Sequence, residues 1–120
     1  MGQPTEREKE FFTRVLLGNL DVARTVWPAG RSYGGTDFDA LARRWLWWAN
    51  KDYAHGTGHG VGHFSCVHED PPWLGRASKL SDNVYSNGMV VTDEPGYYEE
   101  GAFGIRIEDQ LVVQPRSEGK

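Results

Sequence analysis

The sequence predicts a single α+β domain in which two helices come first and short strands follow. Apolar residues recur at helical spacing in two stripes before residue 51. A glycine-rich segment then begins at His55, where a helix is unfavourable. From Val84 to Pro115, short runs of strand-forming residues alternate with turn residues. Two helices followed by several strands indicate the α+β class.

The first helix is expected to begin after Thr5, which forms a capping-box pattern with Glu8. Pro28 is expected to end this helix, while Gly18 and Asn19 weaken its middle. A stripe of this period usually faces a core, so we expect a scaffold helix. The stripe runs through Phe12, Val15, Leu16, Leu20, Ala23, Val26 and Trp27.

The second helix is expected to be capped by Thr36 or Asp39 and to run to about Asn50. Three tryptophans make this helix apolar on nearly all sides. A helix of that kind is normally enclosed within a larger structure, so it is expected to need further packing partners. The tryptophans are Trp45, Trp47 and Trp48.

Three strands are expected after the glycine-rich segment, over residues 88–93, 103–108 and 110–114. The dipeptide Pro95-Gly96 and residue Gly101 separate them. Gly and Pro contribute 15 and 6 residues, so sharp turns are important in this chain.

Composition excludes several classes of protein. With 13 basic and 17 acidic residues, the net charge is −4 and no basic block exists, so no nucleic-acid partner is expected. No apolar run spans a membrane and the N-terminus lacks a secretory signal, so no membrane partner is expected. A single cysteine favours a reducing compartment, and the expected location is cytoplasmic.

All four histidines lie close together in the sequence, at His55, His59, His63 and His68. The glycines between them favour a looped or extended segment, in which the backbone can approach a ligand or a metal closely. The alternative interpretation is that a histidine of this group is a structural residue, with its ring nitrogens hydrogen-bonded within the core.

Two carboxylates downstream are candidate partners of these histidines. Glu94 lies in TDEPG, and Glu108 lies in GIRIED, where strand alternation places Arg106 on the same face as Glu108. Carboxylates with one imidazole suit Mn²⁺, Co²⁺ or Zn²⁺. The alternative reading is that both glutamates are ordinary surface residues.

Three further residues have side chains that could take part in catalysis, but they are expected to be structural. Cys66 is expected to be a small buried apolar residue rather than a nucleophile. Tyr97 and Tyr98 are expected to serve in packing rather than in catalysis.

Six segments resemble the catalytic domain of aminopeptidase P, the Xaa-Pro aminopeptidase of the pita-bread metallopeptidases. They are PTEREKEFFTRVL, DALARRWLW, HGTGHGVG, VHE, GMVVTDEPGYYE and GAFGIRIED, and the likeness covers residues 4–113. The resemblance implies a partial pita-bread (creatinase/aminopeptidase) fold, with two helices followed by a curved, mainly antiparallel sheet. It makes residues 1–120 a partial catalytic domain, with a helical part over about 4–50 and metal-site loops and strands over about 53–114.

The resemblance also implies a set of site residues. The family binds two divalent cations, usually Mn²⁺, through two Asp, one His and two Glu. His59, Glu94 and Glu108 match the histidine and the two glutamates. His55 matches a histidine that contacts substrate, His68 one that lines the proline-side pocket and assists proton movement, and Arg106 an arginine that orients the ligands.

The implied reaction removes the N-terminal residue from peptides with proline at the second position, with Glu94 also as general base. The family's Asp pair precedes the segment that matches residues 4–17, so three of the five ligands are expected here. We therefore expect a catalytic-domain fragment that binds at most one metal weakly and does not hydrolyse Xaa-Pro peptides alone. Its open strands and tryptophan helix are expected to make it a homo-oligomer.

Two other interpretations stay open at this stage. One is a non-enzymatic pita-bread protein that binds peptides or proteins, although retention of His59, Glu94 and Glu108 argues against it. The other is one chain of a split or self-associating assembly, in which another copy supplies the missing elements.

Overall fold

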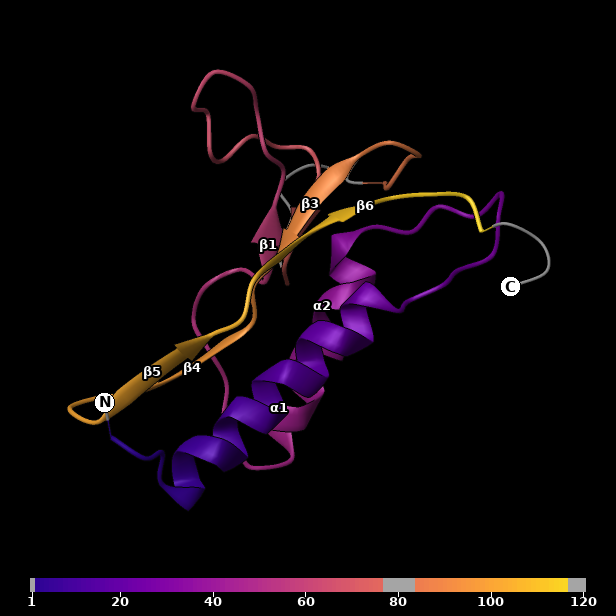
Figure 1. Ribbon diagram of the computed structural model, residues 1–120. Helices are drawn as coiled ribbons and strands as arrows, with labels where there is room; N and C mark the ends of the chain where they lie inside the picture. The colour runs from indigo at the N-terminus through magenta and orange to yellow at the C-terminus, as the bar shows by residue number, and fades with distance from the viewer. Residues whose placement is uncertain (1, 77–83, 117–120) are drawn as a thin grey trace.

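The computed structural model describes residues 2–76 and 84–116 of the 120-residue chain. Two helices lie side by side and the strands run along them (Figure 1). The helices precede all the strands, as the sequence predicts. The elements are α1 Glu6–Ala23, α2 Gly35–Trp47, β1 Gly58–His59, β2 Trp73–Leu74, β3 Val90–Asp93, β4 Gly96–Glu99, β5 Phe103–Arg106 and β6 Asp109–Val112.

Helix α1 begins with the predicted capping box. The Glu8 amide donates to Thr5 Oγ1 at 3.2 Å, and the Thr5 amide donates to Glu8 Oε2 at 2.6 Å. The helix ends at Ala23 rather than at Pro28, and Arg24 is its C-cap. The N-terminal prediction is confirmed, and the predicted end is too late.

The buried face of α1 differs from the predicted stripe. Phe12 is 49% exposed, so its place in the stripe was wrong. A Cβ on Gly18 would lie 2.1 Å from the Ala42 carbonyl oxygen, so glycine permits the close approach of α2. Gly18 and Asn19 are thus part of the packing face and not weak points. The buried residues of α1 are Phe11, Val15, Gly18, Asn19 and Val22.

Helix α2 begins at Gly35, where Gly34 is the N-cap and its amide donates to Asp37 Oδ2 at 2.8 Å. Thr36 and Asp39, the predicted caps, lie inside the helix. Trp47 is 42% exposed and Trp48 is 73% exposed, so this side of α2 is open. The expectation that the tryptophans need further partners stays a prediction.

The strands form three antiparallel pairs, β1 with β2, β3 with β6, and β4 with β5. A bridge between Gly60 and Val91 sets β1 beside β3. Figure 1 shows that the chain bends between β3 and β4 and again between β5 and β6, so the two pairs form one curved ribbon. Strand β4 was missed because Pro95-Gly96 was interpreted as a break, whereas the chain resumes pairing at Gly96.

Two apolar clusters lie between the helices and the strands. The first joins both helices to β4, where the Phe11 and Tyr97 rings stack at 3.9 Å, and contains Phe11, Val15, Leu46, Tyr53 and Tyr97. The second, called the Phe38 cluster here, contains Val22, Phe38, Ala42, Leu74 and Val91, with Trp27 and Tyr85 packed against it. The packing role predicted for Tyr97 is confirmed.

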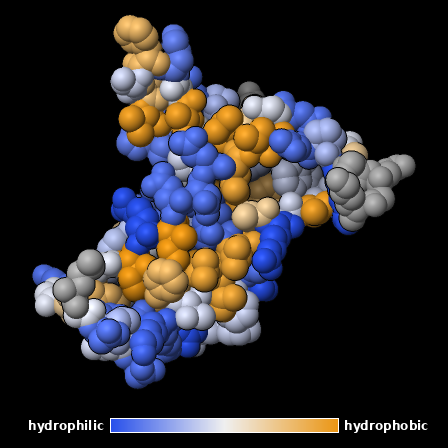
Figure 2. Space-filling model, in the orientation of Figure 1, coloured by the Kyte–Doolittle hydropathy of each residue, from blue (hydrophilic) through white to orange (hydrophobic). Residues whose placement is uncertain are grey.

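A loop over residues 61–70 projects from the strands (Figure 1) and carries apolar surface at its tip (Figure 2). Phe64 is 97% exposed. Cys66 is also exposed, because the loop that carries it projects from the rest of the chain. The expectation that Cys66 is buried was therefore wrong. Within the described residues, no helix is both long and apolar enough to cross a membrane.

Candidate metal centre

His59 and Glu94 come together at the ends of two neighbouring strands. His59 closes β1 and Glu94 directly follows β3. His59 Nε2 lies 3.0 Å from Glu94 Oε1, and the two side chains are only 11% and 13% exposed. The pairing of these two predicted ligands therefore follows from the contact between β1 and β3.

Glycine at position 58 allows this contact. A Cβ on Gly58 would lie 1.8 Å from the Thr92 carbonyl oxygen. The Glu94 amide donates to the Thr57 carbonyl at 2.7 Å, which fixes the two segments against each other. The glycine-rich segment thus serves close approach of backbone to backbone at the site.

Thr92 links the two candidate ligands, and sequence reasoning missed it. Its hydroxyl oxygen accepts the His59 amide hydrogen at 2.9 Å and its O–H donates to Glu94 Oε1 at 3.0 Å. Thr92 is buried. In the sequence, the role of Thr92 is indicated only by its position two residues before Glu94, which places both on the same face of a strand. Threonine is common in strands, so this position does not distinguish it.

The surroundings of His59 favour metal binding. Its Nδ1 lies 2.8 Å from the Gly60 carbonyl oxygen, to which an Nδ1–H donates. The lone pair of Nε2 is then available to a cation beside the Glu94 carboxylate oxygen. Histidines that ligate metals usually donate their second ring N–H in this way.

The distance between the two donors also fits one cation. Ligand atoms of His and Glu lie about 2.0–2.2 Å from a divalent transition metal, so two of them at a right angle are roughly 3 Å apart. The separation of His59 Nε2 and Glu94 Oε1 is 3.0 Å. One imidazole with one carboxylate suits Mn²⁺ or Zn²⁺ better than Ca²⁺.

A second group of side chains flanks this pair. The Tyr98 hydroxyl lies 2.8 Å from His55 Nε2 and accepts a hydrogen bond from Arg106 Nε at 2.8 Å. Arg106 Nη1 is 4.0 Å from Glu94 Oε2. Tyr98 is 44% exposed and connects His55 to Arg106, and the expectation that it serves in packing rather than in catalysis stays a prediction.

His68 and Glu108 have different positions. The His68 ring lies edge-on to the His59 ring, with centroids 4.3 Å apart. Glu108 is exposed between β5 and β6. In residues 2–76 and 84–116, no three His, Cys, Asp or Glu side chains form a group able to hold a metal ion. The role of Glu108 as a third ligand therefore stays a prediction.

Asp93 points away from Glu94 into the protein. It is fully buried, and its Oδ2 accepts a hydrogen bond from Asn19 Nδ2 at 3.2 Å, while Oδ1 has no hydrogen-bond partner among the described residues. Burial, with the charges of Asp109 and Glu94, raises the pKa of Asp93 to about 8. Because it is buried against Asn19, this carboxyl group is separate from the pair formed by His59 and Glu94.

Comparison with known proteins gives consistent relatives. The sequence model of metallopeptidase family M24 matches residues 1–115. The probable Xaa-Pro aminopeptidase P of Sclerotinia sclerotiorum is 49% identical over 113 residues, which are 94% of this chain and 18% of that protein. The probable Xaa-Pro aminopeptidase P of Laccaria bicolor is 50% identical over 113 residues, which are 94% of this chain and 17% of that protein.

Two solved structures share the fold. X-prolyl aminopeptidase from Caenorhabditis elegans, described as a cytosolic enzyme with a di-nuclear active site, has a TM-score of 0.81 at 37% identity, over 90% of this chain and 17% of that chain. Xaa-Pro dipeptidase from Bacillus anthracis has a TM-score of 0.79 at 34% identity, over 95% of this chain and 30% of that chain. The chain therefore spans less than a third of the length of these relatives.

Proposed function

Because this chain belongs to metallopeptidase family M24 and has part of the pita-bread fold, we propose that it carries part of a metal centre for peptide hydrolysis. The proposed substrate is a peptide with proline at the second position, and the bond cleaved is the one before that proline. The family resemblance and the fold class predicted from the sequence are confirmed.

The contact between His59 and Glu94 carries this proposal. Their donor atoms are 3.0 Å apart, and both side chains are largely buried. When bound there, a divalent cation supplies Lewis acidity for hydrolysis of the peptide bond. His59 Nε2 and the Glu94 carboxylate would hold it, and the Gly60 carbonyl keeps the His59 ring in the orientation that binding needs.

Glu94 is also proposed as the general base. Thr92 donates to its Oε1, and Arg106 lies beside its Oε2. These contacts orient the carboxylate, which is proposed to accept a proton from a water molecule at the reacting carbonyl. His68 packs edge-on against His59, and His55 is connected to Glu94 through Tyr98 and Arg106. His55 is proposed to contact the peptide, and His68 is proposed to line the proline-side pocket and assist proton movement.

Mn²⁺ is the proposed metal, and one weakly bound ion is proposed for this chain. The described residues bring only a His–Glu pair together, so water would complete the coordination. Glu108 is proposed to join the pair when the centre holds its full complement of two ions. We further propose the two-part layout predicted above, with helices over about 4–50 and site segments over about 53–114.

A cytoplasmic location and self-association are also proposed. The single cysteine and the cytosolic description of the Caenorhabditis elegans relative support the location. Exposed Trp47 and Trp48 support a homo-oligomer. Light scattering over a range of concentrations tests this, and a monomer at every concentration would contradict it.

A non-enzymatic role in binding peptides is the second candidate. It is favoured by one observation, the absence of a three-ligand group from the parts of the chain that the structure describes. Metal binding at His59 distinguishes the two candidates, because a protein that only binds peptides needs no cation there.

Calorimetric titration with Mn²⁺ tests the proposal. One weak site is expected, lost in His59→Ala and kept in His63→Ala, since His63 lies in the exposed loop. No turnover of an Xaa-Pro peptide is expected from the isolated chain. Two tight sites, or turnover abolished by a chelator, would contradict the single-site proposal, and an absence of binding would contradict the metal centre.

A further inference from the structure

Arg43 on α2 is a buried hub of hydrogen bonds beneath the segment that leads to His59. Its side chain is only 3% exposed. Its Nε donates to Asp39 Oδ2 at 2.7 Å, and its Nη1 and Nη2 donate to the carbonyl oxygens of Tyr53 and His55 at 2.7 and 2.9 Å. The guanidinium also lies 3.9 Å from the centre of the Tyr53 ring. One side chain thus holds the backbone of residues 53–55 at two points.

Thr57 extends this hub toward the candidate metal centre. Its hydroxyl donates to Asp39 Oδ1 at 2.5 Å, and the Tyr53 hydroxyl therefore donates to Thr57 Oγ1, also at 2.5 Å. Burial raises the pKa of the Tyr53 hydroxyl, so it stays a donor. All four side chains are buried, and together they are called the Arg43 network.

Two contacts connect the Arg43 network to the candidate ligands. The Thr57 carbonyl oxygen accepts the Glu94 amide hydrogen at 2.7 Å. Thr57 also directly precedes β1, so its position sets that of His59 two residues later. The segment that the network holds therefore carries His59 and anchors Glu94.

Stability alone does not account for these residue types. Removing charged groups from water is expensive, and a buried ion pair can often be replaced by apolar side chains with no loss of stability. A planar guanidinium with fixed donors can instead hold a carboxylate and two carbonyl groups in one geometry. Apolar side chains cannot fix backbone carbonyls in this way.

We propose that Arg43, Asp39 and Thr57 are positioning residues for the metal centre. They fix residues 53–57, and through them they keep His59 Nε2 and Glu94 Oε1 within reach of one cation. This inference rests on the metal site proposed above. None of the three touches the cation or the substrate.

The test compares Thr57→Val with Thr57→Ser. Valine keeps the branched shape but has no hydroxyl, whereas serine keeps the hydroxyl. Loss of an outer contact of this kind typically weakens metal binding about 10–100-fold, so Thr57→Val should bind Mn²⁺ that much more weakly. Thr57→Ser should bind Mn²⁺ as the unchanged protein does. If Thr57→Val does not fold, Tyr53→Phe removes one donor to Thr57 and should give a smaller loss in the same direction.

Two further measurements separate positioning from stability. Val22→Ala, in the Phe38 cluster, should lower stability without changing Mn²⁺ affinity. In the metal-free chain, Thr57→Val should weaken the hydrogen-exchange protection of the Glu94 amide more than that of the Val113 amide, which donates to Met89.

The outcomes are distinguishable. Equal losses of Mn²⁺ affinity in Thr57→Val and Val22→Ala, or unchanged protection of the Glu94 amide, would overturn the positioning role. If the unchanged chain binds no Mn²⁺, the metal centre is wrong, and the exchange measurement still decides whether the network positions Glu94.

Discussion

Adjacent faces of helix α2 support two regions that differ in chemistry. Phe38 and Ala42 point into the Phe38 cluster, while Asp39 and Arg43, one residue further along, belong to the Arg43 network. Residues four apart on a helix share a face, so one helix serves both regions. The comparison assigns a different role to each region. The apolar region contributes to stability and does not require one exact packing geometry, whereas the polar region holds its hydrogen-bonded groups in a defined geometry.

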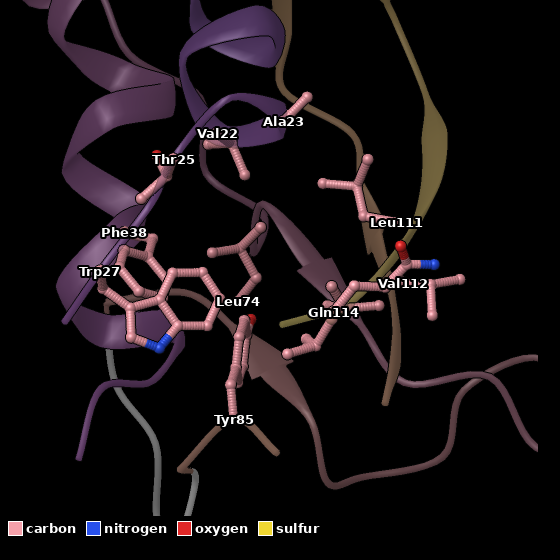
Figure 3. A pocket seen from close by; sticks show the side chains of 12 residues that line it. Val22, Ala23, Thr25, Trp27, Phe38, Leu74, Tyr85, Leu111, Val112 and Gln114 are labelled. Carbon is pink, nitrogen blue, oxygen red and sulfur yellow. The ribbon is translucent and has the colours of Figure 1, made fainter. Parts of the chain in front are cut away.

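The Phe38 cluster is loosely packed at its edge. A cavity of about 210 Å³ lies between the end of α1 and β6, and Trp27, Phe38, Leu74 and Tyr85 face it (Figure 3). The Arg43 network, in contrast, satisfies its polar groups at distances of 2.5–2.9 Å. Changes in the first region should alter stability alone, and changes in the second should also alter the metal centre.

The largest effect is expected from Arg43→Met, because it leaves the Asp39 carboxylate buried without its partner. Breaking a buried ion pair from one side costs about 3–5 kcal/mol of unfolding free energy. Urea unfolding measures this loss. As a control, Arg43→Met combined with Asp39→Leu should recover part of the loss, since no unpaired charge remains. A single variant as stable as the unchanged chain would remove the distinction between the two regions.

A smaller effect is expected from Val22→Ala on the apolar side. Val22 is 9% exposed, and the two carbon atoms removed are worth about 2 kcal/mol, including the enlarged cavity. The same unfolding experiment measures it, and Mn²⁺ affinity should not change. A fall in Mn²⁺ affinity comparable to that of Thr57→Val would show that the two regions do not have separate tasks.

The smallest effect is expected at Asp52, at the exposed rim of the Arg43 network. Its burial would raise the pKa of this carboxyl, but hydrogen bonds from Arg43 and Trp47 outweigh that effect and lower it below 3.8. A carboxyl group with a lowered pKa stabilises the folded chain at pH values above its pKa in the unfolded chain. This stabilisation is lost as the pH falls through the pKa in the folded chain. Asp52→Asn should therefore cost at most about 1 kcal/mol at pH 7, because the side chain is 33% exposed.

Unfolding measured from pH 7 to pH 2 checks the prediction for Asp52. The difference between the variant and the unchanged chain should shrink below pH 4 and vanish when the carboxyl is protonated in both states. A difference that grows toward acid pH would contradict the assigned direction.

Local signals in the sequence were sufficient for part of this structure. The capping box of Thr5 and Glu8 depends on residues three apart, and it is present as predicted. The grouping of His59 with Glu94 came from motif order and a family resemblance, and the two side chains are in contact. The exposed loop around Cys66 gave no such signal, and Cys66 was expected to be buried from its residue type alone.

The features that sequence reasoning missed depend on contacts between distant segments. Gly18 was interpreted as a weak point of the first helix. Its role is to let Ala42 on the other helix approach closely, and the residues around Gly18 in the sequence do not indicate this contact. The Arg43 network and Thr92 join α2, residues 53–57 and β3, and no spacing along the chain indicates such pairs.

The most direct test of the account uses Mn²⁺ as a paramagnetic probe. Bound Mn²⁺ broadens the NMR signals of nearby nuclei, so its position can be read from the backbone amides. We expect the amides of His59, Thr92 and Glu94 to broaden first as Mn²⁺ is added, while the Trp27 indole signal beside the Phe38 cluster broadens later. His59→Ala should abolish this pattern. Broadening centred on other acidic residues, or the same pattern in His59→Ala, would contradict a cation held by His59 and Glu94.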